Sequence, residues 1–116
     1  MSVFSSDDLN LSPERVAELL ESGEIDLIDV REAYEWEAGR IDGARHIELE
    51  RLASQAESID RERPVVFQCR LGARSAMATQ AFRASGYNAM NLEGGIQAWV
   101  EAGLPLVPEG GTVADH

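Results

Sequence analysis

The chain has little cysteine, little positive charge and no long apolar run. Its single cysteine, Cys69, excludes an intrachain disulfide and leaves too few thiolate ligands for a cysteine-built zinc site. No stretch of the 116 residues approaches the length of apolar sequence that spans a bilayer, so we expect no membrane association. Residues 1–8 lack a basic region followed by an apolar stretch, so no export signal is expected and the predicted location is cytoplasmic.

The charge balance and the length narrow the class of protein further. A formal charge of −11 argues against a nucleic-acid partner, because affinity for phosphate depends on Lys and Arg. A chain of 116 residues has the size of one domain, which we place at residues 1–107. Residues 108–116 carry paired glycines and no apolar periodicity, and are predicted to form a disordered tail.

Short β-rich runs alternate with helical patterns along the chain, which is typical of an α/β domain with a largely parallel sheet. The predicted strands are residues 26–30, 46–47, 64–68 and 89–92. The predicted helices are the run from the N-cap Ser12 to Gly23, residues 33–38, 49–59 and 75–86, and the run from Gly94-Gly95 to Gly103.

The clearest predicted strand leads directly into Cys69, and residues 69–75 connect that strand to a helix. Main-chain N–H groups at a helix start favour negative charge, and a thiolate is negative. Arg70 and Arg74 add two cations, and Gly72 lets the loop turn tightly. A lone cysteine is more often a small buried hydrophobe, but this setting favours a reactive nucleophile.

Four segments, which follow one another in the order that the family has, resemble motifs of the single-domain rhodaneses; the cysteine loop is given first. They are Cys69-Arg70-Leu71-Gly72-Ala73-Arg74-Ser75 for C-x-x-G-x-R-S, Leu27-Ile28-Asp29-Val30-Arg31 for the D-V-R strand, Gly39-Arg40-Ile41-Asp42-Gly43-Ala44 for the G-H-I-P-G-A turn, and Leu92-Glu93-Gly94-Gly95-Ile96 with Ala98-Trp99 for the L-x-G-G ending. The sequence departs from the turn motif at Arg40 and Asp42. The resemblance covers Asp26 to Pro105, and the order and spacing of the motifs make it specific.

The resemblance implies a single rhodanese-like domain with a mostly parallel five-stranded sheet and helices on both faces. It implies a sulfurtransferase in which the catalytic Cys69 takes a sulfane sulfur from thiosulfate or a persulfide donor and passes it to a thiol, cyanide or a protein. No metal and no organic cofactor are expected. The substrate-binding residues would be Arg70, Leu71, Gly72, Ala73, Arg74 and Ser75.

Two other functions remain open from the sequence. A phosphatase or arsenate reductase of related fold is disfavoured, because those enzymes place one residue more between cysteine and clamp arginine than the four, residues 70–73, found here. A sulfur-relay or binding module serving a partner protein is not separated from an independent enzyme.

Three polar residues keep alternative roles. Asp29 and Arg31 either shape the site or, as we favour, brace neighbouring loops. Ser75 either donates to the bound sulfur or caps the helix, and both roles are compatible.

Overall fold

The computed structural model describes residues 9–116. Its strands are β1 (Asn10–Leu11), β2 (Asp26–Asp29), β3 (Arg45–His46), β4 (Val65–Gln68) and β5 (Ala89–Leu92). Its α-helices are α1 (Pro13–Glu21), α2 (Ala33–Ala38), α3 (Leu52–Gln55), α4 (Ala73–Ala84) and α5 (Gly95–Glu101), and short 3₁₀ turns flank α3 at Leu49–Arg51 and Ala56–Ser58.

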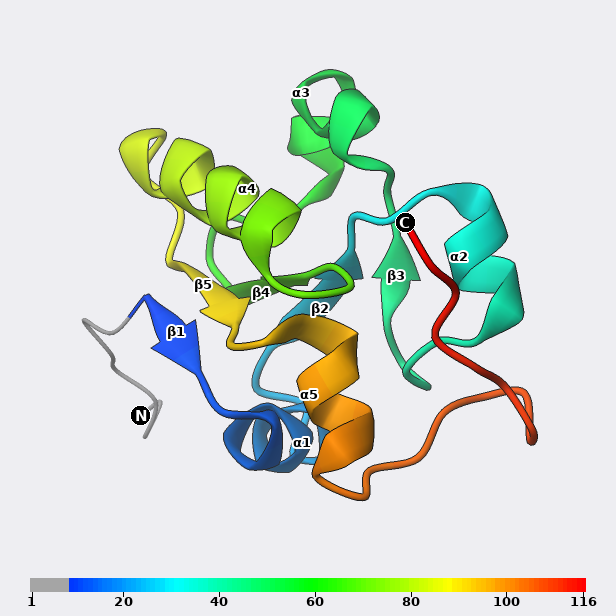
Figure 1. The fold of residues 1–116 in the computed structure, drawn as a ribbon. Coiled ribbons are helices and arrows are strands. Elements are labelled where there is room, and N and C mark those ends of the chain that lie inside the picture. The colour runs from blue at the N-terminus through cyan, green and yellow to red at the C-terminus, as the bar shows by residue number, and fades with distance from the viewer. Residues whose placement is uncertain (1–8) are drawn as a thin grey trace.

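The five strands form one sheet in the order β1-β5-β4-β2-β3, and every pairing between them is parallel. This confirms the predicted α/β fold with a five-stranded sheet (Figure 1). Strand β1 is not among the strands that the local pattern predicts, because two residues are too short to show alternation. Strand β1 lies at the edge of the sheet and pairs with β5, with Leu11 opposite Leu92.

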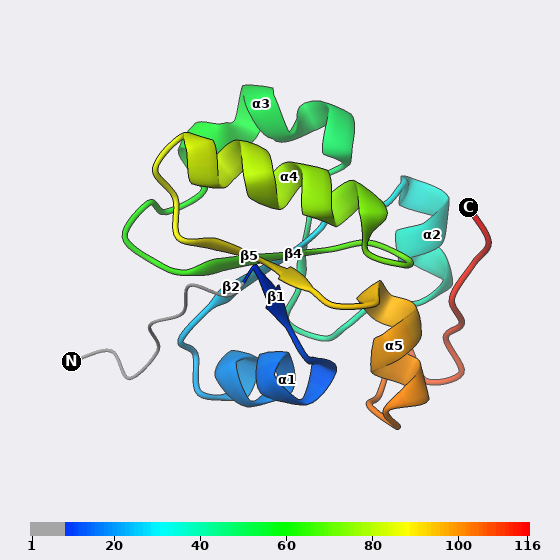
Figure 2. The ribbon, with the colours of Figure 1, turned by 60° about the vertical axis from the view of Figure 1, so that its left-hand side comes forward.

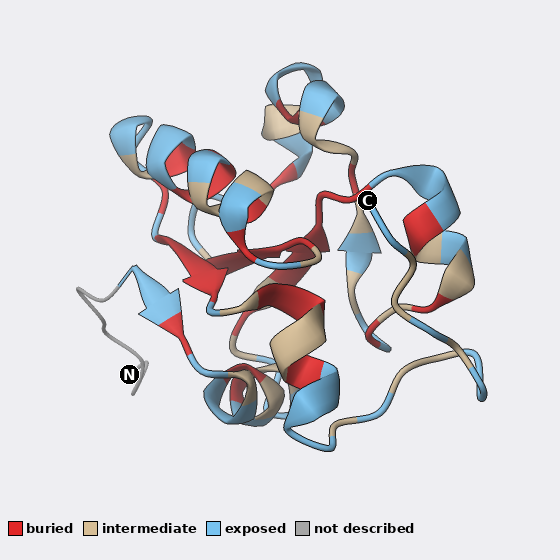
Figure 3. Ribbon diagram, in the orientation of Figure 1, coloured by how far each residue is buried: buried red, intermediate tan, exposed pale blue. Residues whose placement is uncertain are grey.

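Helices cover both faces of the sheet, with α1 and α5 on one side and α3 and α4 on the other (Figure 2). Alternate residues of the central strands β2, β4 and β5 supply the two cores. Leu27, Val66 and Met90 belong to the core under α1 and α5, whereas Ile28 and Phe67 belong to the core under α3 and α4. Strands β2, β4 and β5 are therefore covered on both faces, and apart from Asp26 at the start of β2 all their residues are buried. Figure 3 colours these buried residues red.

Local signals set several element boundaries. The hydroxyl of Ser12 accepts a hydrogen bond from the Arg15 N–H at 3.1 Å, and Pro13 occupies the first turn of α1. Helix α4 begins at Ala73, two residues before the predicted start, because Gly72 caps it in a left-handed conformation. The weakly patterned run 49–59 forms two 3₁₀ turns around α3 instead of one helix.

Residues 108–116, predicted as a disordered tail, make main-chain hydrogen bonds in the structure. The Thr112 N–H donates to the Ala38 carbonyl at 2.9 Å, and the Gly111 N–H donates to the Pro108 carbonyl at 2.8 Å. The segment lies beside α2 (red in Figure 1). Hydrophobic periodicity depends on side chains alone. A segment that is held by main-chain hydrogen bonds therefore shows no periodic pattern in its sequence.

Within residues 9–116, no helix combines the length and apolar character needed to cross a membrane.

Candidate functional site

The loop after β4 brings three hydrogen-bond donors to the sulfur of Cys69. The Gly72 N–H lies 3.1 Å from Sγ, the Ser75 N–H 3.5 Å and the Ser75 hydroxyl 3.3 Å. Donors aimed at one atom stabilise negative charge on it, as hydrogen bonds to an anion do in general. In the structure the Ser75 hydroxyl donates to the sulfur of Cys69 itself, and Gly72 is the N-cap of α4. Donation from Ser75 to a transferred sulfur stays a prediction.

Helix α5 holds this loop with its N–H groups turned inward. The carbonyls of Cys69 and Arg70 accept the N–H groups of Ile96 and Gln97 at 2.8 and 3.1 Å. With these carbonyls bonded to α5, the N–H groups of Gly72 and Ser75 face the sulfur. A Cβ on Gly95 would lie 2.4 Å from the Cys69 carbonyl oxygen, so only glycine allows this approach.

Asn91 of β5 fixes the turn of the loop. Its amide donates to the Gly72 carbonyl at 3.3 Å and to Asn10 Oδ1 at 3.1 Å. The turn at Gly72 has a φ of 105°, which favours glycine. Strand β5 and the edge strand β1 thus help to position the loop.

Arg74 is held in a bidentate ion pair with a buried carboxylate of α2. Its Nη1 and Nη2 lie 2.9 and 3.0 Å from the two oxygens of Glu35, whose side chain is 0% exposed. Burial alone raises the pKa of Glu35, but the hydrogen bonds from Arg74 and the main chain at Glu32 outweigh it and hold the pKa below its ordinary value. The same hydrogen bond raises the pKa of Arg74.

Glu35 was not among the residues singled out from the sequence. A signal for it did exist, because the carboxyl ends of parallel strands share one edge of the sheet. The segment after β2 therefore lies near the loop after β4, and an acid there can meet an arginine of residues 69–75.

Arg70 forms the second ion pair of the loop, at its outer side. Its Nη2 lies 3.1 Å from Oδ1 of Asp115, whose side chain is 97% exposed. Asp115 belongs to the segment predicted to be disordered, and no sequence pattern links it with the loop.

Cys69 opens onto a small pocket although its exposed fraction is only 1%. The pocket has a volume of about 190 Å³ and is lined by Cys69, Arg70, Leu71, Ala73, Arg74 and His116. All seven residues from Cys69 to Ser75 thus line the pocket or donate to the sulfur. A larger apolar pocket of about 580 Å³ lies between α3 and α4 and does not include Cys69.

Asp29 and Arg31 form a buried brace beneath the site. Arg31 Nη2 lies 2.7 Å from Asp29 Oδ2 and 2.8 Å from the Gly39 carbonyl oxygen, and both side chains are fully buried. The pair ties the end of β2 to the end of α2. This agrees with the loop-bracing role favoured from the sequence.

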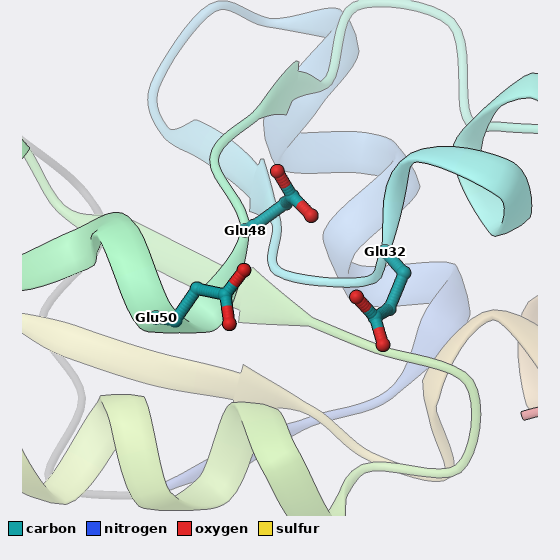
Figure 4. A group of neighbouring side chains, drawn as sticks. All are labelled: Glu32, Glu48 and Glu50. Atoms are coloured by element: carbon teal, nitrogen blue, oxygen red, sulfur yellow. The ribbon is translucent and has the colours of Figure 1, made fainter.

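Three acidic side chains, Glu32, Glu48 and Glu50, form a group on the surface of the molecule (Figure 4). The carboxylates of Glu32, Glu48 and Glu50 approach within 4.8 Å of one another. They line a depression of about 220 Å³ that shares Arg74 and His116 with the Cys69 pocket. Exposed acidic groups are common without a bound ion, so we treat this cluster as part of the surface charge around the site.

The comparisons with known proteins agree with this architecture. The family model of the rhodanese-like domain matches residues 12–102. This chain belongs to the rhodanese-like family. A relative named sulfurtransferase from Allochromatium vinosum is 37% identical over 94 residues, which are 79% of this chain and 88% of the relative.

Two further rhodanese-like proteins extend the likeness. A thiosulfate sulfurtransferase from Shewanella oneidensis, GlpE, is 32% identical, over 80% of this chain and 93% of its own length. The crystal structure of a rhodanese-related protein from Thermoplasma volcanium has a TM-score of 0.79 at 30% identity, over 84% of this chain and 96% of that one. Relatives named sulfurtransferase support a transferase as the class of this rhodanese-like chain.

Proposed function

We propose that this rhodanese-like chain transfers sulfane sulfur through a persulfide formed on Cys69. The observation that carries the proposal is the convergence of three donors, two main-chain N–H groups and one hydroxyl, on the sulfur of the chain's only cysteine. A relative named thiosulfate sulfurtransferase supports thiosulfate as a donor, and the same chemistry admits a persulfide donor.

In the first step the Cys69 thiolate attacks the outer sulfur of thiosulfate. A new S–S bond forms to Cys69, the S–S bond of thiosulfate breaks, and sulfite leaves with the electron pair. The negative charge then lies on the terminal sulfur of the persulfide. The N–H groups of Gly72 and Ser75 and the Ser75 hydroxyl stabilise the charge on the Cys69 sulfur before the attack. We expect the same group of donors to stabilise the charge on the terminal sulfur after transfer.

In the second step a nucleophilic acceptor removes the terminal sulfur and regenerates the Cys69 thiolate. With a thiol acceptor, the acceptor becomes the persulfide; with cyanide, it becomes thiocyanate. Arg70 and Arg74 supply positive charge at the pocket mouth, and Leu71 and Ala73 form its apolar wall. The proposed reaction uses no metal and no organic cofactor.

Intact-mass spectrometry tests the covalent step. Incubation with thiosulfate is expected to add one sulfur atom to the protein, and cyanide is expected to remove it. Cys69→Ser removes the only thiol and is expected to abolish the gain. A protein that gains no sulfur from thiosulfate or from a persulfide donor, although correctly folded, would contradict the proposed function.

A further inference from the structure

The segment 107–116 is fastened to the end of α2 by main-chain hydrogen bonds. Arg40 and Val107 form an antiparallel bridge with N–H to carbonyl distances of 2.8 and 2.9 Å. Thr112 continues the attachment through its bond to Ala38. The segment therefore has a defined path toward the Cys69 pocket.

Two glycines make this close approach possible. A Cβ on Gly39 would lie 2.5 Å from the Thr112 carbonyl oxygen, and one on Gly111 would lie 3.1 Å from the Cα of Gly39. Two stretches of main chain touch here without side chains between them. The attachment therefore depends on the residue type at both positions.

The attached segment delivers two side chains to the site. The Tyr34 hydroxyl donates to the Asp115 carbonyl at 3.0 Å, which fixes the main chain there. The Asp115 carboxylate pairs with Arg70, and His116 lines the Cys69 pocket. A segment remote in sequence from residues 69–75 thus forms part of the pocket wall.

The charge of the pocket follows from these contacts. Both cations of the loop already have a carboxylate partner: Arg74 pairs with Glu35, and Arg70 pairs with Asp115. An anionic donor that reaches Arg70 must share it with Asp115, and the repulsion grows with the charge of the donor. Of the two ion pairs, the one between Arg70 and Asp115 can be changed without loss of the fold. Solvent screens this exposed pair, and no buried group depends on it.

We propose that Asp115 is a specificity-determining residue that lowers reactivity toward doubly charged donors relative to singly charged ones. This inference rests on the proposed function, because it concerns the donor of the Cys69 step. It predicts that the pocket is better suited to a sulfane-sulfur donor of low charge than to thiosulfate.

The effect of donor charge can be measured with two sulfur donors that react with Cys69 in the same way but carry different charges. Thiosulfate releases sulfite, whereas singly charged methanethiosulfonate releases methanesulfinate. In both cases the Cys69 thiolate forms the new S–S bond and the leaving group takes the electron pair, so atoms and charge balance. The kcat/KM for sulfur transfer to cyanide is measured with each donor.

The test compares Asp115→Asn with the unmodified chain. We expect kcat/KM for thiosulfate to rise roughly threefold to tenfold, mainly through KM, with a smaller rise for methanethiosulfonate. Glu109→Gln is the matched control, because Glu109 is an exposed acid of the same segment that does not line the Cys69 pocket. It should leave the ratio of the two donors unchanged.

A second variant tests the position of the Asp115 carboxylate separately from its charge. Tyr34→Phe keeps the carboxylate of Asp115 but removes the hydroxyl that fixes its main chain, so it should shift the donor ratio in the same direction by a smaller factor. Normal sulfur loading with an unchanged ratio in Asp115→Asn overturns the inference and leaves the proposed function intact. No loading of the unmodified chain by either donor overturns the proposed function, and the inference with it.

Discussion

The two sides of the Cys69 loop are supported in opposite ways. On the inner side, Arg74 pairs with a fully buried carboxylate, and Gly95 brings α5 against the loop carbonyls. On the outer side, Arg70 pairs with Asp115, which is almost fully exposed. Two arginines of one short loop therefore do different work: Arg74 belongs to the framework, while Arg70 presents a charge that its partner can tune.

The difference follows from desolvation. The side chain of Glu35 is fully buried, so its negative charge is stabilised by the guanidinium of Arg74 instead of by water. Removing either partner leaves the other charge uncompensated and destabilises the fold. Asp115 remains hydrated, so its pair with Arg70 contributes little to stability. The inner contacts should therefore govern folding and the shape of the loop, and the outer contact should govern only the choice of donor.

The largest expected effect comes from breaking the inner side at Gly95. Gly95→Ala places a Cβ against the carbonyls of Cys69 and Arg70 at a φ of +64°, so we expect a loss of about 3–5 kcal/mol and of sulfur loading. Urea unfolding and intact mass measure the two effects. Gly103→Ala is the control, because its φ is +82° but open space surrounds it, and it should cost only about 1–2 kcal/mol. Equal losses in both variants would show that close packing at Gly95 is unimportant.

Removal of Glu35 is expected to have the next largest effect. Glu35→Ala leaves Arg74 without its partner, so we expect a loss of about 2–3 kcal/mol, below the value for a fully buried pair because Arg74 is 19% exposed. Glu37→Ala, at an exposed position of the same helix, is the control for helix effects. Asp115→Asn should leave the unfolding midpoint unchanged. A Glu35→Ala midpoint as high as that of Asp115→Asn would contradict the difference in stability expected between the buried and the exposed ion pair.

The smallest expected effect is on the acid side of the stability curve. Because the pKa of folded Glu35 lies below its ordinary value of 4.5, this group stabilises the fold above that pH, and the contribution is lost as pH falls through the lowered pKa. In Arg74→Met the lowering by Arg74 is absent, and burial opposes ionisation. The variant should therefore lose less stability than the unmodified chain on acidification below about pH 4.5. Urea midpoints across this range measure the difference, and parallel curves would contradict it.

Local patterns predicted most of the sheet and the loop between β4 and α4, because strand hydrophobicity and helix starts are encoded in neighbouring residues. Strands β4 and β5 emerged close to their true bounds, and the fold class is confirmed. Strand β1 escaped local patterning because its only support is pairing with β5, a partner far along the chain. The catalytic role of Cys69 and the binding roles of its neighbours stay predictions.

The residues that complete the site were missed for a physical reason. Glu35 lies in a helix rich in acids, where nothing local distinguishes a buried carboxylate from an exposed one. Asp115 lies in a segment with no apolar periodicity, held to α2 through the main chain. Both reach the loop through tertiary contacts, which sequence spacing does not encode.

Helix α5 supplies the hydrogen-bond partners of the Cys69 and Arg70 carbonyls. The Cys69 loop can therefore take up its folded form only late in the synthesis of the chain. A nascent polypeptide that has emerged only as far as residue 90 already contains residues 69–75 but lacks α5. In such a chain the Cys69 and Arg70 carbonyls do not yet have the N–H groups of Ile96 and Gln97 as partners. The donors are therefore expected to gather around the sulfur only after the ribosome has released residues 95–101.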